Sequence, residues 1–321
     1  MSGSSMGTQP ILTLTVNPAL DISTSTAQVH SELKLRCSTS RLDPGGGGVN
    51  VSRVVRRLGG RTLAVYTAGG PIGDAYRHLI EGEGVPALVV PIHGSTRESF
   101  TVSEESSGKQ FRFVLGGPEL SNTEWLSCLD FLTQAIAVGG FVVASGSLPP
   151  GVPDDFYARV VRLAHEHGAR CIVDAAGPPL SEALKEGTFL ISPSRRELSI
   201  LFDAELESEQ SQVDAARTLI ANGSAEYVAL TLGAEGALLV SRDGTLRLQA
   251  PIVDVVSTVG AGDSFLAGFV LRLAQQRSVE EAFRTAVAAG AAAVMRPGTE
   301  LCRRADVERL EAGLIPVAGQ A

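Results

Sequence analysis

A short glycine-rich turn that ends in a carboxylate is the part of the sequence best suited to chemistry. Residues 257–264 read Ser-Thr-Val-Gly-Ala-Gly-Asp-Ser and lead directly into an apolar helical pattern. At a helix N-terminus, free backbone N–H groups and the helix dipole favour an anion such as phosphate. We expect Asp263 to be ionised and to accept a hydroxyl proton, while the amides of Gly260, Ala261 and Gly262 hold a transferring phosphoryl group. The alternative is that Asp263 only caps the helix.

A second glycine cluster also opens a helical pattern. Residues 44–50 read Pro-Gly-Gly-Gly-Gly-Val-Asn, and apolar residues then recur at helical spacing as far as Gly59, which predicts the helix stop. Consecutive glycines are costly to order, so the run favours close approach of a ligand to the backbone. The alternative is a flexible linker, although such linkers do not open into amphipathic helices.

Neither cluster matches the fingerprints of the common nucleotide-binding loops. No Lys-Ser or Lys-Thr follows either turn, so the P-loop pattern is absent. Asn50 and Phe265 occupy the third glycine positions of G-x-G-x-x-G. Nicotinamide binding therefore loses its main support.

Length and charge set broad limits. The chain has 321 residues and a net charge of −8, which fits one α/β domain with an appendage or two domains. The main basic feature is Arg53, Arg56 and Arg57, which we place on the outer, solvated face of one helix. Nucleic acid is not expected as a partner.

The four cysteines and the N-terminal segment indicate the compartment. Cys37, Cys128, Cys171 and Cys302 form no C-x-x-C pair, which is typical of reduced, mostly buried thiols in a cytoplasmic protein and gives no support for a metal cluster. No apolar run reaches the roughly 18 residues of a membrane span. Residues 1–10 are too polar for a signal peptide, so we interpret them as disordered or as a cloning remnant.

Short apolar runs that end in a polar residue alternate with helical patterns along the chain. Because parallel strands buried on both faces are apolar throughout, and ligands gather outside their carboxyl ends, these polar residues predict one functional edge. The predicted strand ends are Asn17, Ser145, Asp174, Ser192 and Thr231.

Two segments lack this alternation. Residues 34–42 have no helical spacing, and residues 99–115 alternate around a hairpin turn at 105–108. We expect strands of a small separate sheet that covers the ligand cleft or pairs with another subunit. Lys34, Arg36 and Arg97 would then be candidate ligands of a sugar phosphate, or else solvated charges.

Seven motifs resemble the ribokinase-like (pfkB-type) carbohydrate kinases, and among them the minor-type ATP-dependent 6-phosphofructokinases. They are residues 15–21, 45–50, 96–98, 145–151, 231–236, 258–264 and 298–302. The resemblance implies an α/β fold, a three-layer α/β/α sandwich with a central, mostly parallel sheet plus a small β-sheet lid. The kinase domain would span 11–316, with lid strands from about 21–43 and 96–116. Its activity would be transfer of the ATP γ-phosphate to a ketohexose phosphate by a homodimer joined through the lids.

The resemblance also implies roles for individual residues. Asp263 is similar to the family's general base, and the 260–262 amides to its anion hole. The residues similar to the family's sugar-phosphate ligands are Asp21, Gly46, Gly47 and Asn50 for the sugar, and Lys34, Arg97 and Ser147 for the phosphate. Asp21 could instead be a turn cap.

On the nucleotide side, the resemblance assigns ATP contacts to Ser192, Ser194, Thr231, Gly233 and Gly236. Glu197 is the counterpart of the glutamate that orients water around Mg²⁺. The family usually carries Asn-x-x-Glu preceded by Lys-Pro, so Ser192 and Ser194 depart from the pattern and leave one cation and one amide missing.

The third glycine of the run bears on the substrate. Related fructose-1-phosphate and tagatose-6-phosphate kinases tend to carry Lys where Gly47 stands, which favours fructose 6-phosphate as acceptor and fructose 1,6-bisphosphate as product. Tagatose-6-phosphate or fructose-1-phosphate kinase activity is the alternative. A second alternative is a weakly catalytic protein that binds sugar phosphate and nucleotide.

Overall fold

The computed structural model describes residues 8–314, so residues 1–7 of the expected N-terminal segment and 315–316 of the expected kinase domain lie outside it. The main sheet has nine strands in the order β13-β12-β11-β10-β9-β8-β1-β4-β5. Neighbouring strands from β11 to β5 are parallel, and β12 and β13 are antiparallel additions at one edge. The strands are β1 (Ile11–Thr15), β4 (Leu63–Ala68), β5 (Ala87–Pro91), β8 (Phe141–Ser145), β9 (Arg170–Asp174), β10 (Thr188–Ile191), β11 (Ala225–Thr231), β12 (Ala237–Ser241) and β13 (Gly244–Leu248).

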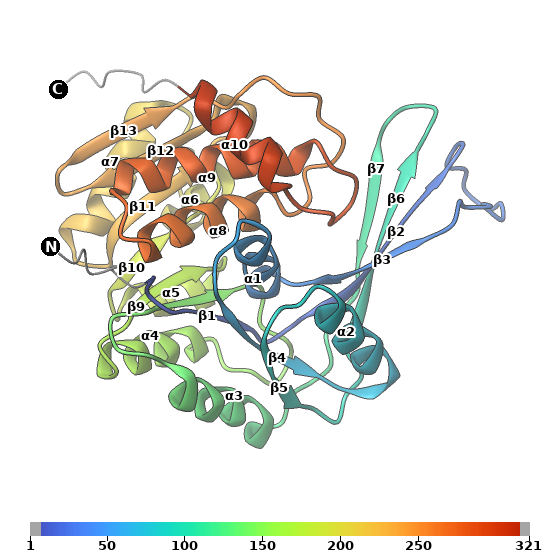
Figure 1. The fold of residues 1–321 in the computed structure, drawn as a ribbon, viewed down its shortest axis with the longest axis horizontal. Helices are drawn as coiled ribbons and strands as arrows, with labels where there is room; N and C mark the ends of the chain where they lie inside the picture. Colours follow the sequence, from blue (N-terminus) through green and yellow to red (C-terminus); the bar gives the residue numbers. More distant parts are fainter. Residues whose placement is uncertain (1–7, 315–321) are drawn as a thin grey trace, which may run out of the picture.

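Helices cover both faces of this sheet and give the three-layer sandwich (Figure 1). One face packs mainly against α3 (Asn122–Ala135), α4 (Phe156–Glu166), α5 (Pro178–Leu184), α6 (Arg195–Phe202) and α7 (Glu209–Ala221). The other packs against α1 (Gly47–Arg57), α8 (Ala261–Ala274), α9 (Val279–Val294) and α10 (Arg304–Gly313), with α2 (Gly70–Gly82) beside α1. The apolar side chains of the central strands alternate between these two cores.

The predicted strand ends meet at one edge of the sheet. Ser145, Asp174 and Thr231 are the last residues of β8, β9 and β11, while Asn17 and Ser192 follow β1 and β10 within two residues. Because these strands are parallel neighbours, their polar ends lie side by side. The expected functional edge is therefore confirmed as a structural feature.

A four-stranded lid sheet projects from the body next to this edge (Figure 1). Its strands are β2 (Ala19–Thr26), β3 (Arg41–Gly45), β6 (Arg97–Glu104) and β7 (Gln110–Val114), in the order β3-β2-β6-β7. The hairpin expected within 99–115 is confirmed. The strand expected over 34–42 is wrong for residues 34–40, which form an irregular connection. One backbone bond, from the Ser38 N–H to the Ser25 carbonyl at 2.8 Å, and the hydroxyls of Thr24 and Ser38 hold it to β2.

The two faces of the lid differ because side chains alternate along a strand. Asp21, Ser99 and Val114 are paired across β2, β6 and β7 and face the edge of the main sheet, where they line a cavity. The next row carries Leu42, Ile22, Phe100 and Phe113, and of these Leu42 and Phe113 are exposed. One face of the lid is therefore polar and the other apolar.

Within residues 8–314 no helix is long and apolar enough to cross a membrane. Cys128, Cys171 and Cys302 are buried free thiols and Cys37 is exposed, as the expectation of mostly buried, reduced cysteines requires.

Candidate active site

A cavity of about 180 Å³ lies between the lid and the carboxyl edge of the main sheet. It is the place where the two glycine-led helices and the lid come together. Its lining includes seven residues expected to take part in chemistry or substrate binding, namely Asp21, Gly46, Gly47, Asn50, Arg97, Gly260 and Asp263.

The amino terminus of α8 forms one wall of the cavity. Gly260 is the N-cap residue with φ 73°, a left-handed conformation that favours glycine, and its missing side chain leaves room for Leu301. Asp263 lies in the first turn of α8. Among the described residues the amides of Gly260 and Gly262 have no partner, and the Ala261 amide makes one long bond, of 3.4 Å, to the Thr258 carbonyl. Because no side chain caps this helix, those amides are available to an anion.

Asp263 is half-buried, and within residues 8–314 one of its two carboxylate oxygens is hydrogen-bonded. Asn50 Nδ2 donates to Asp263 Oδ2 at 2.9 Å. Burial raises the pKa of Asp263 to about 6, against the opposing effects of the Asn50 hydrogen bond and the positive charges of Arg53 and Arg112. Asp263 is thus ionised above about pH 6 and can then accept a proton.

The glycine run opens α1 and forms the cavity floor. A Cβ on Gly46 would lie 2.7 Å from Thr15 Cγ2, and one on Gly47 would lie 2.0 Å from Ser145 Oγ. The glycines are therefore needed for the close approach of Thr15 and Ser145, in addition to any approach of a ligand in the cavity. Asn50, one turn into α1, points toward α8 through its bond to Asp263.

Arg97 and Ser147, the expected phosphate ligands, are linked through Asn17. Arg97 Nη2 donates to the Asn17 carbonyl at 3.1 Å, and Asn17 Nδ2 donates to Ser147 Oγ at 3.2 Å. Arg97 lines the cavity, whereas Ser147 is exposed just after β8. Lys34 is not among the cavity's lining residues; it is exposed in the connection between β2 and β3.

Sequence reasoning missed Arg112. This residue of β7 lies on the lid face that lines the cavity, and its charge lowers the pKa of both Asp21 and Asp263. Burial nevertheless raises the pKa of Asp21 to about 6, with Arg53 the largest opposing influence. The sequence did contain a signal for Arg112. Side chains alternate along a strand, so residues 110, 112 and 114 of the predicted hairpin share one face of the lid.

The expected nucleotide residues gather at the ends of β10 and β11. Ser194 and Thr231 are paired in an isolated parallel β-bridge. The Thr231 N–H donates to the Pro193 carbonyl at 2.9 Å. The Ser192 hydroxyl donates to the Ala229 carbonyl at 3.3 Å. Gly233 and Gly236 bound a short 3₁₀ turn, and both have positive φ.

Ser194 and Glu197 form a capping box at the start of α6. The Ser194 hydroxyl accepts from the Glu197 N–H, while the Ser194 N–H and hydroxyl both donate to Glu197 Oε2, at 2.7 and 2.8 Å. This pattern satisfies two free amides of the helix. Ser194 thus has a structural role as a helix cap, and Glu197 keeps Oε1 outside the box.

Asp174 lies between the two groups of residues, because β9 is located between β8 and β10. Its carboxylate accepts from Ser145 Oγ at 2.8 Å. Burial and the nearby carboxylates of Asp263 and Glu197 raise the pKa of Asp174 to about 7, although the Ser145 bond opposes them. The strand-end pattern had located Asp174 at this edge without giving it a role.

The placement of Arg53 on a solvated helix face is wrong. Its side chain is fully buried, and it pairs with Glu83 at 2.5 Å and with Asp43 at 3.5 Å. Arg53 follows Asn50 by three residues, so both lie on the same face of α1. Arg56 is exposed, as expected, and Arg57 is half-buried against Glu83.

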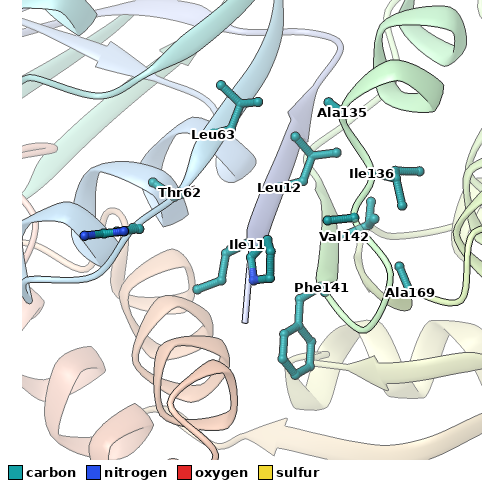
Figure 2. Close-up of a pocket in the computed structure, with 13 residues that line it drawn as sticks. Ile11, Leu12, Thr62, Leu63, Ala135, Ile136, Phe141, Val142 and Ala169 are labelled. Carbon is teal, nitrogen blue, oxygen red and sulfur yellow. The ribbon is translucent and has the colours of Figure 1, made fainter. Parts of the chain in front are cut away.

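A second cavity, of about 200 Å³, lies at the opposite edge of the sheet (Figure 2). Ile11, Leu12, Phe141 and Val142 surround it near the amino ends of β1 and β8. Its lining is mostly apolar, with Arg61 the one charged residue. It offers neither a base nor an anion hole, so the cavity under the lid is the candidate active site.

Known proteins share this architecture and sequence. The profile of the pfkB family carbohydrate kinase matches residues 16–306. The ATP-dependent 6-phosphofructokinase isozyme 2 of Mycobacterium tuberculosis is 46% identical over 303 residues, covering 94% of this chain and 89% of that protein. A tagatose-6-phosphate kinase of Staphylococcus epidermidis is 32% identical over 282 residues, covering 87% and 90%.

Solved structures agree with these matches. The crystal structure of phosphofructokinase-2 from Escherichia coli in complex with fructose-6-phosphate has a TM-score of 0.90 to this chain at 38% identity, and it covers 95% of this chain and 99% of that chain. The chain therefore belongs to the pfkB family of carbohydrate kinases, and the ribokinase-like fold expected for it is confirmed.

Asp263→Asn is expected to lower kcat by ~10²- to 10⁴-fold, the usual contribution of a positioned general base. The swap is nearly isosteric, so folding and ligand binding should persist. In the parent, kcat/KM should rise with pH through about 6, because burial raises the pKa of Asp263 to that value and the base acts when ionised. ADP release measured from pH 5 to 9 tests both statements.

Asp130→Asn, on the exposed surface of α3, is the matched control and should leave the profile unchanged. An Asp263→Asn enzyme within a few-fold of the parent would exclude Asp263 as the base.

Proposed function

We propose that the protein is an ATP-dependent 6-phosphofructokinase, which transfers the γ-phosphoryl group of ATP to the C1 hydroxyl of fructose 6-phosphate. The observation that carries the proposal is the single cavity in which Asp263, at an uncapped helix terminus, lies with two lid arginines, Arg97 and Arg112. A carboxylate and a cationic end in one cavity suit an acceptor that has a hydroxyl to be phosphorylated and a phosphate already in place.

At the sugar end, each group has a separate task. Asp263 accepts the proton of the attacking hydroxyl, and the 260–262 amides hold the charge that develops on the transferred group. Asp21 accepts hydrogen bonds from sugar hydroxyls, and Asn50 and the backbone at 46–47 contact the sugar. Arg97 binds the substrate phosphate, and Arg112, which is paired with Thr101 on the neighbouring lid strand, lines the same cavity.

At the nucleotide end, the chain offers backbone and carboxylate groups. Ser192, Ser194, Thr231, Gly233 and Gly236 line the ends of β10 and β11, where we place the ATP phosphates and adenosine. Within residues 8–314 no three His, Cys, Asp or Glu residues cluster in a way that could hold a metal ion. Mg²⁺ often keeps its waters and takes one or two carboxylates plus substrate phosphates, so Glu197 through Oε1 fits a hydrated ion. Bound there, Mg²⁺ would neutralise charge on the triphosphate.

Gly47 bears on the choice of substrate. A Cβ at this position would lie 2.0 Å from Ser145 Oγ and 3.1 Å from the Ser145 carbonyl carbon, so any side chain here would have to displace Ser145. The Ser145 hydroxyl is held by its bond to Asp174, so a lysine at this point of the cavity floor would disturb that bond. This favours fructose 6-phosphate over the fructose 1-phosphate and tagatose 6-phosphate acceptors.

The proposal predicts that fructose 6-phosphate gives the highest kcat/KM in an acceptor panel with MgATP. Tagatose 6-phosphate, fructose 1-phosphate, fructose and ribose complete the panel, and ADP is the product measured. Arg97→Ala should raise KM for fructose 6-phosphate ~10- to 100-fold and leave KM for ATP nearly unchanged, because a charged hydrogen bond to phosphate is lost.

A higher kcat/KM for another sugar phosphate would reassign the substrate. No turnover with retained binding would indicate a binding protein. Equal shifts of both KM values in Arg97→Ala would make that residue structural.

The hydration of Mg²⁺ can be tested without disturbing the start of α6. Ser194→Asn and Glu197→Gln both preserve the capping box, since Asn is a good N-cap and Gln can replace Glu at the third position. The Ser194→Asn enzyme should reach half-maximal rate at lower free Mg²⁺ than the parent, because the amide offers a donor and an acceptor. Glu197→Gln should need more, because it removes the negative charge that attracts the hydrated ion.

Ser278 and Glu281 form the same capping box at the start of α9, so Ser278→Asn and Glu281→Gln are the matched controls. Mg²⁺ titrations that superimpose for the parent and the α6 variants would exclude the 194–197 segment from metal binding.

The apolar face of the lid supports a homodimer of this chain. Phe113 is 55% exposed and Leu42 45% exposed, and they end a row in which Ile22 and Phe100 lie between them. A second copy of the lid offers an apolar surface of the same size and shape.

Phe113→Glu is expected to convert the dimer to monomers, because the new charge cannot be buried against a second apolar face. Light scattering after size-exclusion chromatography measures the mass directly. Val138→Glu, at an 85% exposed position before β8, is the control and should not change the mass. A Phe113→Glu protein that remains dimeric would place the subunit contact elsewhere.

A further inference from the structure

Arg53 is a fully buried arginine one turn away from the proposed sugar ligand Asn50. Its Nη1 donates to the Pro44 carbonyl at 2.8 Å and to Asn50 Oδ1 at 3.1 Å. Its Nη2 and Nε donate to Glu83 Oε1 at 2.5 and 2.9 Å. One guanidinium therefore ties together the glycine run, the first turn of α1 and the end of α2.

The charges on either side of Asn50 permit only one orientation of its amide. Arg53 can only donate, and an ionised Asp263 can only accept. Asn50 Oδ1 must therefore face Arg53 while Nδ2 faces Asp263 Oδ2 at 2.9 Å. A flipped amide would place N–H groups against the guanidinium and an oxygen against the carboxylate.

We propose that Arg53 is a positioning residue that locks the Asn50 amide and thereby holds Asp263 in place for the reaction. The proposal rests on the function proposed above. The Asn50 bond takes Asp263 Oδ2, and Asp263 Oδ1 has no hydrogen-bond partner among residues 8–314. The lock therefore directs one carboxylate oxygen to a substrate hydroxyl in the cavity.

The anchoring of Arg53 requires a guanidinium. Glu83, at the C-cap of α2, accepts from two of its nitrogens, and the Pro44 carbonyl and Asn50 take the third. A lysine would supply one point charge and could not reach both sides at once. Burial acts to raise the pKa of Glu83, but the hydrogen bonds and charges of Arg53 and Arg57 lower it overall, so the anchor is ionised.

Arg53 also contributes charge to the cavity. The charged groups that face Asp263 are Arg53 from α1, Arg112 from β7 and Asp174 from β9, and Asp21 of β2 and Arg97 of β6 line the same cavity. The charge of Arg53 favours the ionised forms of both Asp263 and Asp21. Removing it is therefore expected to shift the acid limb of kcat/KM to higher pH.

The test compares Arg53→Lys, Asn50→Ala and the double variant with the parent. Arg53→Lys should lower kcat ~10- to 100-fold, the effect of a small misplacement of a reacting group, and should change KM for ATP little. If Arg53 acts through Asn50, the double variant should be no slower than Asn50→Ala alone. Multiplying effects on kcat would overturn the proposal. Arg56→Lys, exposed on the same helix, is the control and should match the parent.

Two further measurements apply if Arg53→Lys does not fold or if the parent is inactive. If Arg53→Lys does not fold, Glu83→Gln is the replacement, because it weakens the anchor of the same guanidinium at a partly exposed position. Its effect on kcat should likewise not add to the effect of Asn50→Ala. If the parent phosphorylates no sugar, the proposed function fails separately. The side-chain amide signals of Asn50 in NMR spectra then decide, since Arg53→Lys should shift them and speed their exchange with water, and unchanged signals would overturn the proposal.

Discussion

The close approach of two helix amino termini to one edge of a parallel sheet is the constraint on which this structure depends. α1 and α8 can both begin at the cavity only because glycines precede them: Gly46 and Gly47 leave no room for a Cβ beside Thr15 and Ser145, and Gly260 adopts a positive φ against Leu301. Backbone amides at the two helix starts then face the cavity, where they can donate hydrogen bonds to a bound anion. The lid closes the remaining side of that space.

Burying charge beside such amides has a cost that the fold offsets locally. Asp21, Asp174 and Asp263 are all buried enough for their pKa values to rise, and each has at least one polar or positive neighbour that opposes the rise. Arg53 is a buried cation that is shielded from solvent, and the carboxylates of Glu83 and Asp43 balance its charge. The resulting network runs from the end of α2 through α1 to α8, so distant elements contribute to the state of one carboxylate.

Local patterns in the sequence predicted the parts of the structure that local physics determines. The starts of α1 and α8, the polar strand ends and the lid hairpin were all predicted from spacing and turn residues. The environment of Arg53 was not predicted, because an arginine on a helix is usually solvated and its anions come from other elements. The contact between Asn50 and Asp263 joins residues 213 apart in sequence, which no periodicity reports. Ser194 shows a third limit, since the comparison with the family motif did not reveal that Ser194 and Glu197 form a capping box at the start of α6.

The alternation of the lid strands gives two surfaces to a single set of residues. Along β7, Arg112 lines the cavity and the next residue, Phe113, is exposed on the other face. Along β2, Asp21 lines the cavity and the next residue, Ile22, does not. A shift of pairing by one residue would exchange the two surfaces, bringing rings into the cavity and charge to the outside. Insertions within these strands are therefore tolerable only in pairs or at a bulge. The polar surface that lines the cavity and the apolar outer surface are therefore determined together by one alternating pattern of side chains.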